Sequence, residues 1–248
     1  MSRAALLLAA ALLLAACSPA PGLERLAPGE TGRVAEIRSG DTLVMENGLA
    51  VRLAGVEAPK GSDPYAREAF VALSKLADGR DVQLLYGGAK RDRYGRALAQ
   101  LKLRRGGRWI ERELLRAGAV RARTWSDNRA MAGAMLEDEA YARNRKLGLW
   151  KLPAYQVLIP QETPARDGFQ IVEGRLRQVT PSGDGVLVRL DAGLNLQLGA
   201  RALADFKTAG KDPARLLGRL VRVRGPLRYG PTLVLDHPEQ LEVLKTAN

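Results

Sequence analysis

The chain contains 248 residues, with 39 Lys and Arg against 27 Asp and Glu, one His and one Cys, and its formal net charge is +12. This length suits one large domain or two small ones. A single cysteine excludes a disulfide within the chain. The basic balance favours a polyanionic partner such as nucleic acid, lipid headgroups or lipopolysaccharide, without choosing among them.

An uninterrupted run of Ala and Leu spans residues 4–16 and ends at Cys17, in the order Leu-Ala-Ala-Cys. The run is too short to cross a bilayer as a mature helix and has the size of the apolar core of a signal peptide. Its end has the pattern of a bacterial lipoprotein cleavage site. We therefore predict a lipoprotein signal peptide over 1–16, lipidation of Cys17 and an exported protein anchored in the envelope by lipid alone. Ser18 favours the outer membrane, facing the periplasm; an ordinary signal peptide with an incidental cysteine is the alternative.

Residues 17–30 hold three prolines and little periodicity, so we interpret them as a tether. From Thr31 the pattern changes to short alternating segments, and Asn47-Gly48 is a strong hairpin signal. Strands are expected at 33–37, 42–45, 49–53, 82–86 and 97–103. Helices are expected at 65–76, with Asp63 as N-cap, at 110–117 and at 128–145, capped by Ser126 or Asp127.

Three prolines punctuate residues 152–168, which predicts a linker. The β pattern resumes over 169–245, with a helix expected at 200–208 before the fourth strand. This order suits a small Greek-key barrel, and a plain β accessory domain without a ligand is the alternative. The only histidine, His237, precedes a proline and is expected to be a loop residue, outside any triad or zinc site.

Three short motifs occur once each along the chain. Each is weak alone, but their order and spacing are specific when they are taken together. They are Ser39-Gly40-Asp41-Thr42, the segment from Val51-Arg52-Leu53 to Glu57-Ala58-Pro59, and Asp92-Arg93-Tyr94-Gly95-Arg96. With these motifs, residues 31–151 resemble the staphylococcal nuclease (thermonuclease) domain. The resemblance implies an α+β, mainly β fold: an OB-type five-stranded barrel with three helices. The region 169–245 resembles a second, OB-like barrel.

The resemblance also implies a role for each motif residue. Arg52 and Arg96 would bind phosphate, and guanidinium groups suit this task because they bind phosphate oxygens bidentately. Arg93 and Tyr94 would contact the substrate, and Trp125 would stack a base. The implied Ca²⁺ ligands are Asp41, Glu57 and the backbone carbonyl of Ala58.

One position departs from the family pattern. Lys60 stands where the resemblance implies a glutamate that acts as general base. An ammonium group cannot accept a proton at neutral pH, and loss of a general base typically slows a reaction by a factor of ~10²–10⁴. The pattern therefore allows a slow nuclease.

Three functions are consistent with the sequence. The first, which we favour, is an exported, lipid-anchored, nuclease-like enzyme that hydrolyses DNA or RNA phosphodiesters with Ca²⁺. The second is a non-catalytic module that binds nucleic acid or another polyanion through the arginine-rich stretch 90–123. The third is a structural envelope lipoprotein. Lys60 favours the second function, whereas the set of Asp41, Glu57, Arg52 and Arg96 favours the first.

Overall fold

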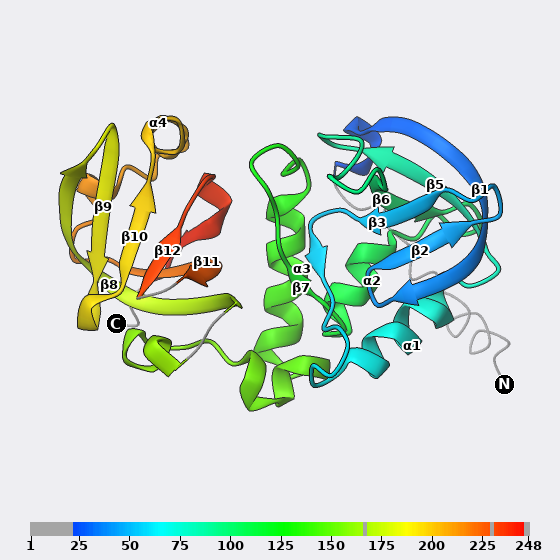
Figure 1. The fold of residues 1–248 in the computed structure, drawn as a ribbon, viewed down its shortest axis with the longest axis horizontal. Helices are drawn as coiled ribbons and strands as arrows, with labels where there is room; N and C mark the ends of the chain where they lie inside the picture. The colour runs from blue at the N-terminus through cyan, green and yellow to red at the C-terminus, as the bar shows by residue number, and fades with distance from the viewer. Residues whose placement is uncertain (1–21, 166–167, 229–230, 246–248) are drawn as a thin grey trace, which may run out of the picture.

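A computed structural model describes residues 22–165, 168–228 and 231–245. The expected signal peptide and Cys17 lie outside these residues. Two β-rich units stand on either side of a central helix, α3 (Ala132–Asn144) (Figure 1). Among the described residues, no helix has the length and apolar character needed to cross a membrane.

The first unit is a closed five-stranded barrel in the order β1-β2-β3-β6-β5. Neighbouring strands are antiparallel except β3 and β6, which are parallel. The strands are β1 (Ala27–Ser39), β2 (Thr42–Met45), β3 (Ala50–Leu53), β5 (Asp81–Tyr86) and β6 (Ala97–Leu103). The expected Asn-Gly turn joins β2 to β3, with Gly48 at φ 80°, a conformation that glycine adopts without steric cost.

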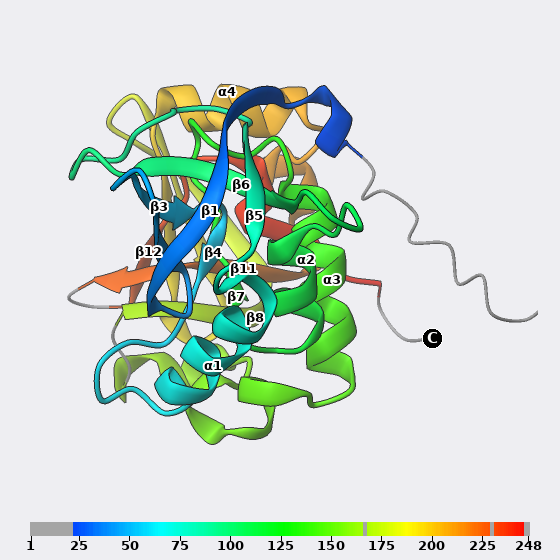
Figure 2. The same cartoon turned by 90° about the vertical axis from the view of Figure 1, so that its right-hand side faces the viewer.

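Helices and a short ribbon cover this barrel. They are α1 (Ala66–Ala77), α2 (Ile110–Arg116) and α3, together with β4 (Val56–Glu57), which pairs with β7 (Arg121–Ala122). In Figure 2 the barrel faces the viewer, with α1 below it. Ala69, Leu73 and Ala77 recur at four-residue spacing on α1 and are fully buried against the barrel. Burying a leucine such as Leu73 contributes about 1.5–3 kcal/mol.

The second unit repeats the same strand order. Its strands are β8 (Gly168–Ser182), β9 (Gly185–Leu190), β10 (Asn195–Leu198), β11 (Leu220–Arg228), β12 (Thr232–Val234) and β13 (Leu241–Val243). β12 pairs in parallel with β10 and antiparallel with β11, which closes the ring β8-β9-β10-β12-β11. The third and fifth strands are therefore parallel in both barrels, so the expected OB-like character of the second unit is confirmed. Helix α4 (Ala200–Thr208) precedes its fourth strand.

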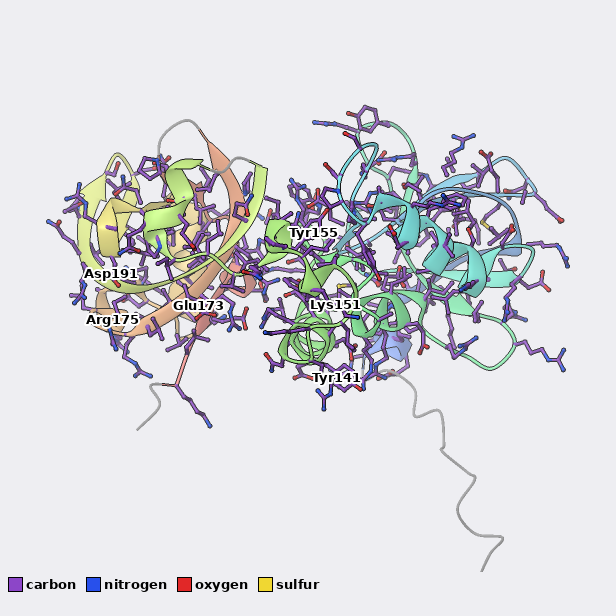
Figure 3. All side chains as sticks on the ribbon, turned by 90° about the horizontal axis from the view of Figure 1, so that it is seen from below. Tyr141, Lys151, Tyr155, Glu173, Arg175 and Asp191 are labelled. Atoms are coloured by element: carbon purple, nitrogen blue, oxygen red, sulfur yellow. The ribbon has the colours of Figure 1, made fainter. Side chains whose placement is uncertain are left out.

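Short 3-10 helices connect these elements. They are η1 (Leu23–Arg25), η2 (Gly148–Lys151), η3 (Pro153–Tyr155), η4 (Pro160–Ala165), η5 (Asp191–Gly193), η6 (Pro213–Leu216) and η7 (Pro238–Gln240). The expected linker is thus largely folded into η3 and η4. Figure 3 shows Tyr155 of η3 between the two barrels, and its hydroxyl donates to the Pro64 carbonyl at 2.6 Å.

Three local expectations were wrong. Residues 22–30 belong to the first barrel and not to a tether, because Leu23 and Leu26 are buried in the barrel core and β1 begins at Ala27. Asp63 does not cap α1; its carboxylate accepts from the Lys60 N–H at 2.9 Å, and Tyr65 at φ 74° precedes the helix. Helix α3 begins at Ala132 rather than near residue 128, because Asn128 instead pairs with Trp125 through its backbone and donates from its side chain to the Ala89 carbonyl at 3.3 Å.

The barrels are joined by a buried ion pair. The Arg224 side chain of β11 is 2% exposed, and its Nη1 lies 2.8 Å from Glu139 Oε2 on α3. Its Nη2 lies 2.7 Å from Glu242 Oε1. Burial acts to lower the pKa of Arg224, but the two glutamates raise it above its ordinary value. The guanidinium therefore stays charged and links α3 to the second barrel.

Replacing Arg224 with Met is expected to lower the free energy of unfolding by roughly 3 kcal/mol. This is the lower end of the range for removing one partner of a buried pair, because Arg143 still faces Glu139. Urea denaturation followed by circular dichroism measures the change. Arg201→Ala, on the exposed surface of α4, is the control and should change stability by less than about 0.5 kcal/mol. Equal effects of the two variants would contradict the role of Arg224.

Glu111 of α2 predicts a pH dependence of stability. Its carboxyl is fully buried, and burial raises its pKa to about 8. Because the folded pKa lies above the unfolded one, this group stabilises the protein fully below its ordinary pKa of 4.5. That contribution is lost as pH rises towards 8, by at most about 1.4 kcal/mol per pH unit. Between these two pH values, the melting temperature of Glu111→Gln should decline less than that of the natural chain. Identical declines in melting temperature would exclude Glu111 as the cause.

Candidate functional site

A pocket of about 710 Å³ opens between the first barrel and the loop that follows β7. Six of its lining side chains are cationic and four are carboxylates. The cations are Arg52, Lys60, Arg91, Arg93, Arg96 and Arg123, and the carboxylates are Glu57, Asp92, Asp127 and Asp236. The structure thus brings the expected residues Arg52, Lys60, Arg93, Tyr94, Arg96, Trp125 and Glu57 to one cavity with a positive balance.

Arg52 lies on the polar face of β3, between the buried side chains of Val51 and Leu53. Its Nη2 donates to the Val56 carbonyl at 2.8 Å, and its Nη1 donates to the Leu53 carbonyl at 3.0 Å. The same Nη2 lies 3.0 Å from Asp41 Oδ2. Desolvation lowers the pKa of Arg52, although Asp41 and Glu57 oppose that shift. The guanidinium is therefore held rigidly in one wall of the pocket.

Asp41 is fully buried just behind this wall, in the turn between β1 and β2. Its Oδ1 accepts from the Ser39 and Thr42 hydroxyls, each at 3.0 Å. Its Oδ2 accepts from the Ala58 N–H at 2.8 Å, and Lys60 Nζ lies 3.7 Å from the same oxygen. Hydrogen-bond donors and two cations therefore already surround this carboxylate.

Glu57 faces a different set of cations. It lies opposite Arg121 in the β4–β7 pairing, and its Oε2 lies 3.6 Å from Arg121 Nη2. Its Oε1 makes a short ion pair with Arg123. The two carboxylates that the resemblance assigns to a metal are thus each neutralised separately.

The residues present do not fit the implied calcium site. Calcium takes six to eight oxygen ligands. Here Asp41 is paired with Arg52 and Lys60, and Glu57 with Arg121 and Arg123. At Ala58 it is the N–H, a donor, that contacts Asp41. Over the described ranges there is no group of three or more His, Cys, Asp or Glu side chains suited to a metal.

The loop from Asp92 to Arg96 forms the rim of the pocket. Asp92 Oδ2 accepts from Arg96 Nε at 2.7 Å, and Asp92 Oδ1 accepts from the Tyr94 N–H at 2.9 Å. Burial acts to raise the pKa of Asp92, but the hydrogen bonds from Arg96 and the Tyr94 N–H lower it. The Tyr94 ring is 68% exposed, with the guanidinium of Arg93 4.8 Å and that of Arg96 5.4 Å from its centroid.

A second exposed ring lies across the pocket. Trp125 is 44% exposed, and the Arg123 guanidinium lies 4.7 Å from its centroid. The backbone of Trp125 pairs with Asn128, which holds the loop before α3. Exposed rings beside cations suit the stacking of nucleobases next to a bound phosphate backbone.

Two residues of the pocket region were missed by the sequence reasoning. Asp236 of the second barrel lines the pocket, and His237, expected to be a loop residue, is fully buried between the barrels. The only available signal was the position of Asp236 and His237 directly after a strand, before a proline. Until the packing of the two barrels is known, nothing in the sequence relates Asp236 and His237 to residues 52–127.

Sequence comparison agrees with the geometry of the first barrel. Residues 50–152 match the family described as Staphylococcal nuclease homologue. The chain is 30% identical over 107 residues to Staphylococcal-like nuclease CAN1 of Arabidopsis thaliana, covering 43% of this chain and 31% of that protein. It is 25% identical over 130 residues to Thermonuclease of Staphylococcus hyicus and 26% identical over 132 residues to that of Staphylococcus intermedius.

The extent of these matches is uneven. The chain spans about a third of the length of the Arabidopsis relative. The two thermonucleases are covered over 76% and 77% of their length, from about half of this chain. The family match ends at residue 152, before the first strand of the second barrel.

The ion pairing around Asp41 predicts that calcium does not bind the natural chain. Calcium titrated into the full chain should give no heat in isothermal titration calorimetry and no rise in melting temperature. Lys60→Glu replaces the ammonium beside Asp41 with oxygen ligands and should gain a measurable calcium affinity. Arg93→Glu makes the same charge change on the rim, away from Asp41, and is the control that should gain none. Calcium binding by the natural chain would contradict the pairing argument.

Proposed function

We propose that the staphylococcal nuclease-like domain of this chain binds single-stranded nucleic acid without calcium. In this proposal the domain is a binding module and does not hydrolyse the strand by general-base catalysis. The observation that carries this proposal is Lys60 Nζ at 3.7 Å from Asp41 Oδ2. The ammonium supplies positive charge next to the buried carboxylate. It also stands in place of the base that the resemblance implies.

The cations of the pocket fit a phosphodiester backbone. Arg96, Arg93 and Lys60 line the cavity around the rigid guanidinium of Arg52. Phosphate contacts of this kind give affinity without sequence preference and make it strongly dependent on salt. Tyr94 and Trp125 present exposed rings, which favour unpaired bases over a duplex.

A second candidate, slow calcium-assisted hydrolysis, is favoured by two observations. Arg52 and Arg96 line the same pocket, and the relatives named above are nucleases. Such a reaction requires Lys60, whose side chain is 52% exposed, to leave Asp41 for solvent. It also requires Asp41 and Glu57 to exchange their arginine partners for the metal.

The proposal includes the cellular setting expected from the sequence. An acyl chain on Cys17 would hold the domain at the envelope, most simply at the periplasmic face of the outer membrane. Nucleic acid or another polyanion of the envelope would meet the pocket there.

Fluorescence anisotropy with a labelled single-stranded oligothymidylate tests binding by the full chain. Affinity should fall steeply between about 50 and 200 mM salt and should be the same with calcium or EDTA. Arg93→Ala should weaken binding and reduce the salt slope by about one. Arg201→Ala, at an arginine that is also exposed but lies on the second barrel, should change neither.

The same samples, incubated with heat-denatured DNA, separate the candidates. Calcium-dependent cleavage by the natural chain would replace the binding proposal with the hydrolase. Cleavage by Lys60→Glu alone would support the proposal, because it shows a site that lacks only its base. Absence of both binding and cleavage, with DNA and with RNA, would exclude both candidates.

A further inference from the structure

Asp236 brings the second barrel into the pocket of the first. It lies two residues after the end of β12, yet its side chain lines the same cavity as Arg52 and Trp125. The expected boundary between the two domains therefore does not separate them at this cavity. The pocket is incomplete without the second barrel.

A chain of hydrogen bonds fixes the Asp236 carboxylate. Its Oδ1 lies 2.5 Å from His237 Nδ1, and His237 Nε2 lies 2.8 Å from the Thr124 hydroxyl. Because the carboxylate accepts, Nδ1 carries the proton and Nε2 accepts from the hydroxyl, as the network assigns. The Asp236 N–H also donates to Gln240 Oε1 at 2.7 Å. These hydrogen bonds hold both the backbone and the side chain of Asp236 in place.

This Thr-His-Asp arrangement is not built for nucleophilic attack. In a hydrolytic triad the hydroxyl faces the substrate and the carboxylate is buried behind the histidine. Here the exposure is reversed: Thr124 is 7% exposed and His237 is buried, whereas the Asp236 side chain is 48% exposed. The chain therefore positions the carboxylate and does not activate the hydroxyl.

The surroundings of Asp236 suggest what it binds. Glu57 and Asp92 are each paired with an arginine of the pocket, whereas within the described part of the chain Asp236 is bonded to the neutral His237 ring and forms no salt bridge with an arginine or lysine. An anionic group repels phosphate, so this carboxylate does not serve the nucleic-acid backbone. A fixed acceptor that shares a pocket with the exposed Trp125 ring suits the edge of a stacked base that carries N–H donors.

We infer that Asp236 is a specificity residue that selects guanine at the base stacked on Trp125; this inference rests on the proposed binding of single strands. A carboxylate has about four lone-pair sites, and His237 uses one. The N1–H and N2–H₂ groups of guanine are adjacent donors that the remaining sites accept together. Adenine and cytosine place a ring acceptor beside their amino group, and thymine flanks its N–H with two carbonyls. Each of these three bases turns at least one acceptor towards the carboxylate.

Anisotropy competition with the full chain tests the inference. The probes are an all-thymine strand and the same strand with one central guanine, adenine or cytosine. The guanine strand should bind roughly fivefold to a hundredfold more tightly than the others. Asp236→Asn should remove most of this preference and strengthen binding of the all-thymine strand, because it removes a repelling charge. Asp184→Asn, in the exposed turn between β8 and β9, is the control and should keep the preference.

Thr124→Val tests the positioning chain separately. It removes the hydroxyl bond to His237 with little change in volume, so the guanine preference should fall while affinity for the all-thymine strand stays within about twofold. Equal binding of all four strands, unchanged in Asp236→Asn, would overturn the inference and leave the proposed function standing. Failure of every strand to bind would overturn the proposed function instead. If the natural chain cleaves DNA, loss of that cleavage in Asp236→Asn with base preference unchanged would make Asp236 a catalytic residue, and it would overturn the specificity role together with the proposed function.

Discussion

The buried carboxylate of Asp41 is the group on which both the first barrel and its pocket depend. It ties the β1–β2 turn through Ser39 and Thr42, the segment after β4 through the Ala58 N–H, and β3 through Arg52. A charge without a partner in this position would cost several kcal/mol, so the cations beside it are held in place. The cations of this pocket wall are therefore part of the fold, and the wall is positive without a bound metal ion.

The second barrel belongs to the same unit. Arg224 reaches α3, Arg121 Nη1 donates to the Phe169 carbonyl at 2.9 Å, and His237 bonds Thr124. Two of these contacts start from β7 and the loop after it, because Arg121 lies on β7 and Thr124 lies between Arg123 and Trp125. The first barrel therefore presents a pocket whose wall is held in place by a second barrel with the same strand order.

Much of the fold could be predicted because it rests on local rules. Alternation of side chains placed Arg52 on the open face of β3, and the Asn-Gly turn fixed the β2–β3 hairpin. The partners of Glu57 could not be predicted, because the sequence offers many arginines that could pair with its carboxylate. Only the β4–β7 pairing shows that Arg121 and Arg123 are the two that do. His237 lies in a loop, as expected, but its burial and its bond to Thr124 could not be predicted, because they exist only where the two barrels meet.

The ion pair between Glu139 and Arg224 also has a consequence for the order of folding. The two residues are 85 positions apart, so Glu139 is synthesised long before Arg224. During synthesis, Glu139 has Arg143, four residues away on the same helix, as its counter-ion until the fourth strand of the second barrel is made. Contacts of such separation form late and slowly. A chain that ended after the first barrel would therefore bury Glu139 with Arg143 alone, and its pocket would lack Asp236.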